Sequence, residues 1–250
     1  MRAKNSLEKL RAKDYDRYIA TKFLPKECHE NLSKWYLWWH SVVGVVKPSD
    51  DPMPQIIRLQ WWIEQLDDST KLKPDQEFYD LISLFRLKNI STKPLILALE
   101  AEQNWLEIPE NQRSLAQMEN WLCEREKLVF SIAQQIFSTE KPNFIAANEQ
   151  KKLNHLFTAY GLVQYVRSGM SFSLPIEWSQ ESWSSAWLSC VESHWNEGKS
   201  MLTHPLLVHM ALIPTYQKRL IKSLISKQKL ASAPILRLLK IWQQMHKIEK

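Results

Sequence analysis

The chain has 250 residues, a net charge of +6, only 4 glycines and three cysteines. That length is enough for a full apolar core, and we expect a single domain over 1–250. The cysteines are widely spaced, the N-terminus lacks an apolar leader, and no run of about 18 apolar residues occurs. We therefore expect neither a secreted protein held together by disulfides nor a membrane-spanning protein. We expect a cytoplasmic protein, soluble or peripheral to an inner membrane, on the matrix side if the protein is mitochondrial.

Scarce glycine and regularly spaced prolines favour helices over hairpin-linked strands. In chain order, apolar residues recur every three or four positions first within 32–46 and later within 153–167. This is the period of one buried helix face. The sequence predicts an all-α fold of about ten helices with no strand.

Several helix starts carry their own signals. Ser114 and Gln117 have the spacing of a capping box ahead of a helix that runs to about residue 138. Pro94, Pro214 and Pro234 stand where a first helical turn tolerates a missing N–H. These signals support one compact helical bundle.

Generic catalytic signatures are missing from the sequence: it has no nucleophile elbow, no phosphate-binding glycine loop and no H-E-x-x-H pair. Cys190 and His194 are four residues apart, so they would share a helix face, but a metal site needs more ligands than two. We expect the histidines to serve packing or to lie at the surface, and we predict no metal site and no cofactor.

Two other features each leave two interpretations open. The twelve tryptophans are expected mainly in the core, with an apolar tunnel or a protein-docking groove as the alternative. Residues 214–250 hold nine Lys and Arg against one acid, Glu249. These basic residues form either a solvated helix face or a surface for an anionic membrane or an acidic partner. Nucleic acid is not expected, because no reading motif accompanies the charge.

Residues 58–62 read R-L-Q-W-W and resemble a motif of the squalene/phytoene synthase family. Weaker likenesses occur in the family's order: a D-R-Y element in 14–18, an F-x-P element in 23–25, a second motif helix in 159–167 and a closing L-P in 173–175. Together they cover about 14–178. The residues that the resemblance marks as motif or structural positions are Gln60, Trp61, Trp62, Tyr160, Gly161 and Pro175.

The resemblance implies the isoprenoid synthase fold, in which two acidic clusters hold Mg²⁺ against prenyl diphosphates around a central apolar cavity. Here 31–49, where the first cluster would lie, contains no Asp or Glu, and neither does 150–176, where the second would lie. Both metal sites are therefore expected to be missing, and no catalytic residue is assigned. The resemblance implies that Arg58 and Arg167 lie near the phosphate-binding elements, so both are candidates for anion binding. The structural alternative is that they pair with Glu64 or another structural acid.

Other acids offer a poor substitute for the missing clusters. Asp50 and Asp51 lie in a proline-bounded loop, where capping or surface roles are expected. Glu124 and Glu126 are two positions apart, so they would point to different sides of one helix.

A branch of this family resembles the chain in keeping the R-x-Q-W/F-W segment and the L-R…L-P segment while losing the acids: the complex I assembly factors of mitochondria and alphaproteobacteria. The resemblance implies a non-catalytic protein that binds respiratory-complex subunits at the membrane. Two alternatives stay open: a head-to-head prenyl transferase, which would require Mg²⁺, and a module that binds a prenyl lipid. We expect Arg58 and Trp62 to fix their helix in the bundle.

Overall fold

A computed structural model describes residues 6–43, 51–67, 76–137, 147–167, 175–178 and 183–226. Every regular element in these segments is a helix, which confirms the predicted all-α fold. The chain divides into two compact units, each described by itself below. Unit 1 comprises Met1–Pro109 and Leu128–Asn143, and unit 2 comprises Glu110–Lys127 and Phe144–Lys250. No described helix has both the length and the apolar character needed to cross a bilayer.

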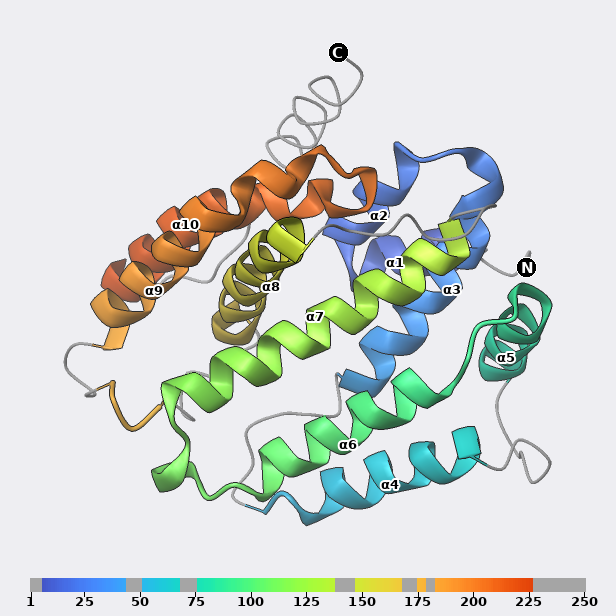
Figure 1. Cartoon of the computed structure of the whole chain (residues 1–250), viewed down its shortest axis with the longest axis horizontal. Helices are drawn as coiled ribbons and strands as arrows, with labels where there is room; N and C mark the ends of the chain where they lie inside the picture. Colours follow the sequence, from blue (N-terminus) through green and yellow to red (C-terminus); the bar gives the residue numbers. More distant parts are fainter. Residues whose placement is uncertain are drawn as a thin grey trace. The chain divides into compact units, whose positions relative to one another are not determined.

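Unit 1 is built around α3. Its helices are α1 (Ser6–Lys13), α2 (Tyr15–Lys22), α3 (Lys26–Val43), α4 (Met53–Asp67), α5 (Gln76–Lys88), α6 (Lys93–Glu107) and the second part of α7 (Leu115–Phe137). Helices α1, α2 and α5 pack against α3, while α4 and α6 lie side by side (Figure 1).

The core of unit 1 is rich in indole rings. Trp35 is fully buried, and its Nε1 donates a hydrogen bond to the carbonyl oxygen of Val129, 3.2 Å away. The rings of Trp38 and Trp39 each lie 5.8 Å from the Trp35 ring, and Phe85 lies 6.2 Å away. Aromatic pairs at such distances contribute about 0.5–1.5 kcal/mol beyond the area that they bury. The expectation that most tryptophans serve the core therefore holds for this α3 group.

The predicted helix starts are confirmed where the structure describes them. In the capping box before α7, Gln117 N–H donates to Ser114 Oγ at 3.2 Å, and Ser114 N–H donates to Gln117 Oε1 at 2.8 Å. Pro94 stands in the first turn of α6, and Pro214 in the first turn of α10 (Ile213–Ser226). Pro234 and most of the basic stretch 214–250 lie outside the described residues.

Unit 2 is built on α8. Its elements are η1 (Glu110–Gln112), the first part of α7, α8 (Ala147–Arg167), α9 (Trp183–Gly198), η2 (Lys199–Thr203), η3 (Pro205–Leu212) and α10. Helices α9 and α10 and the 3₁₀ segment η2 pack against α8 (Figure 1).

Two glycines permit close helix contacts in unit 2. A Cβ added to Gly198 would lie 2.5 Å from the backbone nitrogen of Leu156, and one added to Gly161 would lie 2.8 Å from the Cβ of Leu122. The fully buried Trp187 adds a polar link, since its Nε1 donates to the carbonyl oxygen of Leu162 at 3.2 Å. These contacts fix α9 against α8, and they bring α7 close to α8.

Candidate functional site

The R-L-Q-W-W segment lies on α4, and its second tryptophan joins neighbouring helices. The half-buried ring of Trp62 lies 5.5 Å from the Trp38 ring of α3 and 5.0 Å from the Phe78 ring of α5. Trp61 is 40% exposed and touches the Trp62 ring edge-on at 4.7 Å. Trp62 therefore contacts both α3 and α5, and its importance for stability stays a prediction.

The polar residues of this segment lie at the surface. Arg58 is exposed, and Glu64 accepts a hydrogen bond from Gln60 Nε2 at 3.1 Å. Gln60 in turn accepts one from Gln103 Nε2 of α6, at 3.3 Å. The role of Arg58 as an anion-binding group stays a prediction.

The D-R-Y element forms the start of α2. Asp14 caps this helix, since its Oδ1 accepts from the backbone N–H of Arg17 at 3.1 Å. Its Oδ2 lies 3.3 Å from Arg17 Nη1, and the Arg17 guanidinium lies 5.2 Å from the centre of the Tyr36 ring. This buried arginine therefore links α2 to α3.

The second motif helix is α8. Tyr160 is buried and meets the His209 ring edge-on at 5.0 Å, while Gly161 faces Leu122 as described above. The Arg167 guanidinium lies 3.9 Å from the centre of the Tyr216 ring of α10, and Arg167 Nη1 donates to Gln164 Oε1 at 3.1 Å. Arg167 therefore packs within unit 2 against an aromatic ring.

Pro175 is buried, and its carbonyl accepts a hydrogen bond from the backbone N–H of Trp178 at 3.0 Å. The following residue, Ile176, donates its N–H to the carbonyl of Arg113 at 2.8 Å, so this short segment is attached to the start of α7. The stretch 168–174, which would follow the second motif, lies outside the described residues.

The substitute acids have ordinary structural roles. Asp51 Oδ1 accepts a hydrogen bond from the N–H of Met53 at 2.9 Å, the predicted capping role; Asp50 lies outside the described residues. Glu124 is exposed and pairs with Lys127, whereas Glu126 is buried and lies 3.5 Å from Arg125. The two glutamates point to different sides of α7, as expected.

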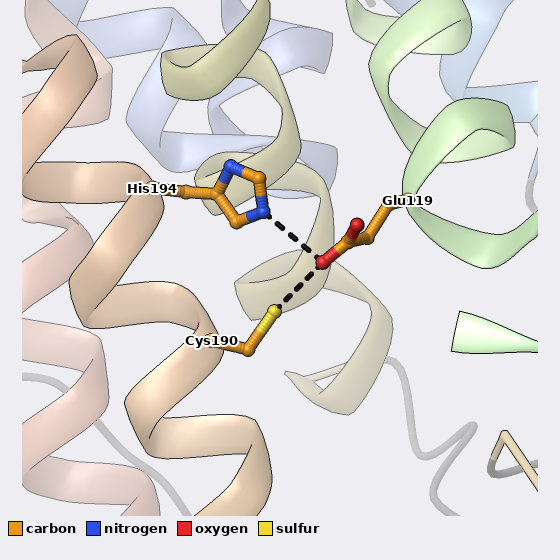
Figure 2. A group of neighbouring side chains, drawn as sticks. All are labelled: Glu119, Cys190 and His194. Carbon is orange, nitrogen blue, oxygen red and sulfur yellow. Dashed lines mark hydrogen bonds and ion pairs between the residues drawn. The ribbon is translucent and has the colours of Figure 1, made fainter. Parts of the chain in front are cut away.

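Unit 2 contains a polar cluster that combines a carboxylate, a thiol and two imidazole rings. Cys190 and His194, one turn apart on α9, both point at Glu119 of α7 (Figure 2). Glu119 Oε1 accepts from Cys190 Sγ at 3.0 Å and lies 3.1 Å from His194 Nε2. On the other side of the His194 ring, Nδ1 lies 2.8 Å from Nδ1 of His155 on α8. All four side chains are half-buried.

The charges in this cluster are set by its hydrogen bonds and burial. The hydrogen bond with His194 lowers the pKa of Glu119, against the opposing effect of burial. Burial strongly raises the pKa of the Cys190 thiol, and the hydrogen bond to Glu119 raises it further. Burial lowers the pKa of His155, and so does the neighbouring His194. Without a bound cation the cluster thus holds a carboxylate and a protonated thiol, which is a poor nucleophile.

This cluster was only half visible in the sequence. The spacing of Cys190 and His194 placed both on one face of a helix, and that part is confirmed. Glu119 is 71 residues before Cys190, and no local pattern connects the two.

Comparison with solved structures gives a match to the crystal structure of a dehydrosqualene synthase in complex with ligand. The TM-score is 0.70 at 16% sequence identity, and the match covers 97% of this chain and 95% of that one. No family model matches the chain, and a search of curated proteins returns no match. The chain therefore has the isoprenoid synthase fold, and identity this low shows the fold alone.

Proposed function

We propose that this chain is a non-catalytic protein of the isoprenoid synthase fold that acts as an assembly or interaction factor for respiratory complex I at a membrane. The observation that carries the proposal is the lack of Asp and Glu in 31–49 and 150–176, the two stretches where the family's acidic clusters would lie. The specific link to complex I comes from the resemblance of residues 58–62 and 159–175 to the acid-less branch of the family.

Prenyl diphosphate chemistry needs divalent cations held by oxygen ligands, because several negative charges must be neutralised as pyrophosphate leaves. From Asn31 to the end of α3 the chain has no acid, and α8 has only Glu149, which is exposed in its first turn. The stretch 150–176 has none. Neither 31–49 nor 150–176 therefore offers a carboxylate that could hold Mg²⁺ against a diphosphate.

Different groups occupy the ends of these helices. His40 stands in the last turn of α3, and burial lowers the pKa of its imidazole, which favours the neutral form. Arg167 ends α8 and stacks on Tyr216. A neutral imidazole and a stacked guanidinium do not replace hard carboxylate ligands for Mg²⁺.

Unit 1 offers a surface suited to a protein partner. Met53, Ile57 and Trp61 recur every four residues along α4 and are 53%, 63% and 40% exposed. Apolar and aromatic side chains gathered on one helix face are typical of interaction surfaces. We name these three residues the α4 stripe and propose that a complex I subunit covers it.

The alternative function is a head-to-head prenyl transferase, which the fold alone permits. Purified protein incubated with farnesyl or geranylgeranyl diphosphate and Mg²⁺ distinguishes the two functions. We expect no metal-dependent release of pyrophosphate. Metal-dependent release would refute the non-catalytic proposal, whereas binding of a prenyl diphosphate without release would favour a lipid-binding module.

Deletion of the gene in its native host tests the proposed role in complex I assembly. We expect the amount of assembled complex I on native gels, and its NADH dehydrogenase activity, to fall while other respiratory complexes stay unchanged. Complementation with Trp61→Ser should fail, and complementation with Leu87→Ser should succeed. Leu87 on α5 is 82% exposed and lies outside the α4 stripe, so it is a matched control. Normal complex I in the deletion strain would refute the proposal.

A further inference from the structure

We propose that Glu119, Cys190 and His194 form a binding site for a divalent cation of the Zn²⁺ class, and that His155 positions His194 for it. The three side chains offer ligand atoms that all lie within 4.8 Å of one another. This site is independent of the proposed assembly role, and its ligands come from unit 2 alone.

The geometry is close to that of a tetrahedral metal site. With metal–ligand bonds of about 2.0–2.3 Å at tetrahedral angles, neighbouring ligand atoms are about 3.4–3.6 Å apart. Here Glu119 Oε1 lies 3.0 Å from Cys190 Sγ and 3.1 Å from His194 Nε2. In each pair the two heavy atoms are joined by a hydrogen bond in the absence of metal. Replacing those hydrogens by a cation requires Glu119 Oε1 to separate from each of its two partners by only about half an ångström, and Cys190 Sγ lies within 4.8 Å of His194 Nε2.

The ligand set selects the metal. A thiolate sulfur, an imidazole nitrogen and a carboxylate oxygen suit Zn²⁺, whereas Mg²⁺ and Ca²⁺ prefer oxygen ligands alone. Three protein ligands leave a fourth position for water. When the sulfur–metal bond forms, the thiol proton leaves to solvent, and the sulfur contributes its electron pair as a thiolate.

His155 provides the support that metal-binding histidines ordinarily have. Once His194 Nε2 binds a cation, its ring proton must reside on Nδ1. Nδ1 of His155 lies 2.8 Å from that atom and accepts the proton in a hydrogen bond. Such a contact fixes the tautomer and the orientation of the ring, and its loss typically lowers metal affinity about 10–100-fold.

The backbone around the site holds the ligands in place without a metal. On α9, the buried Trp187 bonds to α8, and Gly198 contacts the α8 backbone at Leu156. On α7, Met118 and Leu122, which flank Glu119 in the helix, are fully buried. The ligands therefore stand on anchored helices, which limits the ordering cost of binding a cation.

Titration of the full chain, freed of metal by a chelator, with Co²⁺ tests the site. We expect one Co²⁺ per chain, with the visible bands of a tetrahedral ion and a thiolate-to-cobalt charge-transfer band, and displacement by Zn²⁺ but not by excess Mg²⁺. Cys190→Ser should abolish the charge-transfer band. Glu119→Gln and His194→Gln should each weaken binding by more than 10-fold, and His155→Phe by about 10–100-fold.

The matched control is the double variant Cys28→Ser/Cys123→Ser, which leaves Cys190 as the one cysteine of the chain and should keep the band. Circular dichroism of each variant shows whether its helices still form. Zn²⁺ should also raise the melting temperature of the wild type and the control but not of Cys190→Ser. A charge-transfer band that survives in a folded Cys190→Ser protein, or the lack of stoichiometric binding by the wild type, would overturn the proposal.

Discussion

The substitution Gly198→Ala should have two opposite effects on the free energy of unfolding, one from helix propensity and one from steric overlap. Gly198 has φ −96°, a backbone conformation open to any residue, and it ends α9. Judged by helix propensity alone, alanine would stabilise this position by about 1 kcal/mol. The new Cβ, however, would lie 2.5 Å from the nitrogen and 2.8 Å from the Cα of Leu156, which are backbone atoms of α8.

The steric effect should win. Overpacking typically costs about 1–3 kcal/mol, and the upper end applies here because a helix backbone cannot rotate away as a side chain can. Subtracting the propensity gain of about 1 kcal/mol leaves a net loss of about 2 kcal/mol, or a fall of about 4–8 °C in melting temperature for a chain of this size.

Urea unfolding followed by far-UV circular dichroism measures the effect. The control is Ser193→Ala, an exposed position on the same helix, which should change the free energy of unfolding by no more than about 0.5 kcal/mol. If Gly198→Ala were as stable as the wild type or more so, the close approach of α9 to the α8 backbone would be refuted.

Two further predictions concern Trp62 and His204. Trp62→Ala should lower the free energy of unfolding by about 2 kcal/mol, since the ring is half-buried between α3 and α5. Trp61→Ala should lower it by less than about 1 kcal/mol. Urea unfolding midpoints measure both losses, and equal losses would contradict the structural role of Trp62. Burial lowers the pKa of His204, whose Nδ1 accepts the N–H of Leu206 at 3.2 Å. The unfolded chain then binds more protons, so stability is full above the unfolded pKa of about 6.5 and is lost as pH falls below it. His204→Asn keeps an acceptor and should show a smaller loss in urea midpoint between about pH 7.5 and 5.5; equal losses would exclude His204 as the cause.

Periodicity and capping were enough to predict the main helices. The apolar positions of α3 and α8 lie on one face of each helix, because burial of that face holds the helix in its unit. The fully buried residues on these faces include Leu32, Trp35, Leu156 and Val163. The start of α7 followed from Ser114 and its capping partner because that signal is local in sequence.

Other features depend on contacts that a single sequence does not display. The segment Pro205–Leu212 forms the 3₁₀ helix η3, which the sequence did not indicate. Six of its eight residues are buried, so no polar face gives a helical period to read. Glu119 on α7 meets Cys190 and His194 on α9 through tertiary packing, so the sequence alone indicated two ligands of the cluster and not the third.

Unit 1 consists of two segments that are separated in the sequence, and this affects how it can fold during synthesis on the ribosome. Leu128–Asn143 belongs to unit 1, but Glu110–Lys127, made just before it, belongs to unit 2. Until Val129 has been synthesised, the indole N–H of Trp35 lacks the carbonyl that it bonds in the folded protein, and the tryptophan-rich core around α3 is incomplete. We expect residues 1–109 to need shielding by chaperones during translation, and to aggregate when expressed alone.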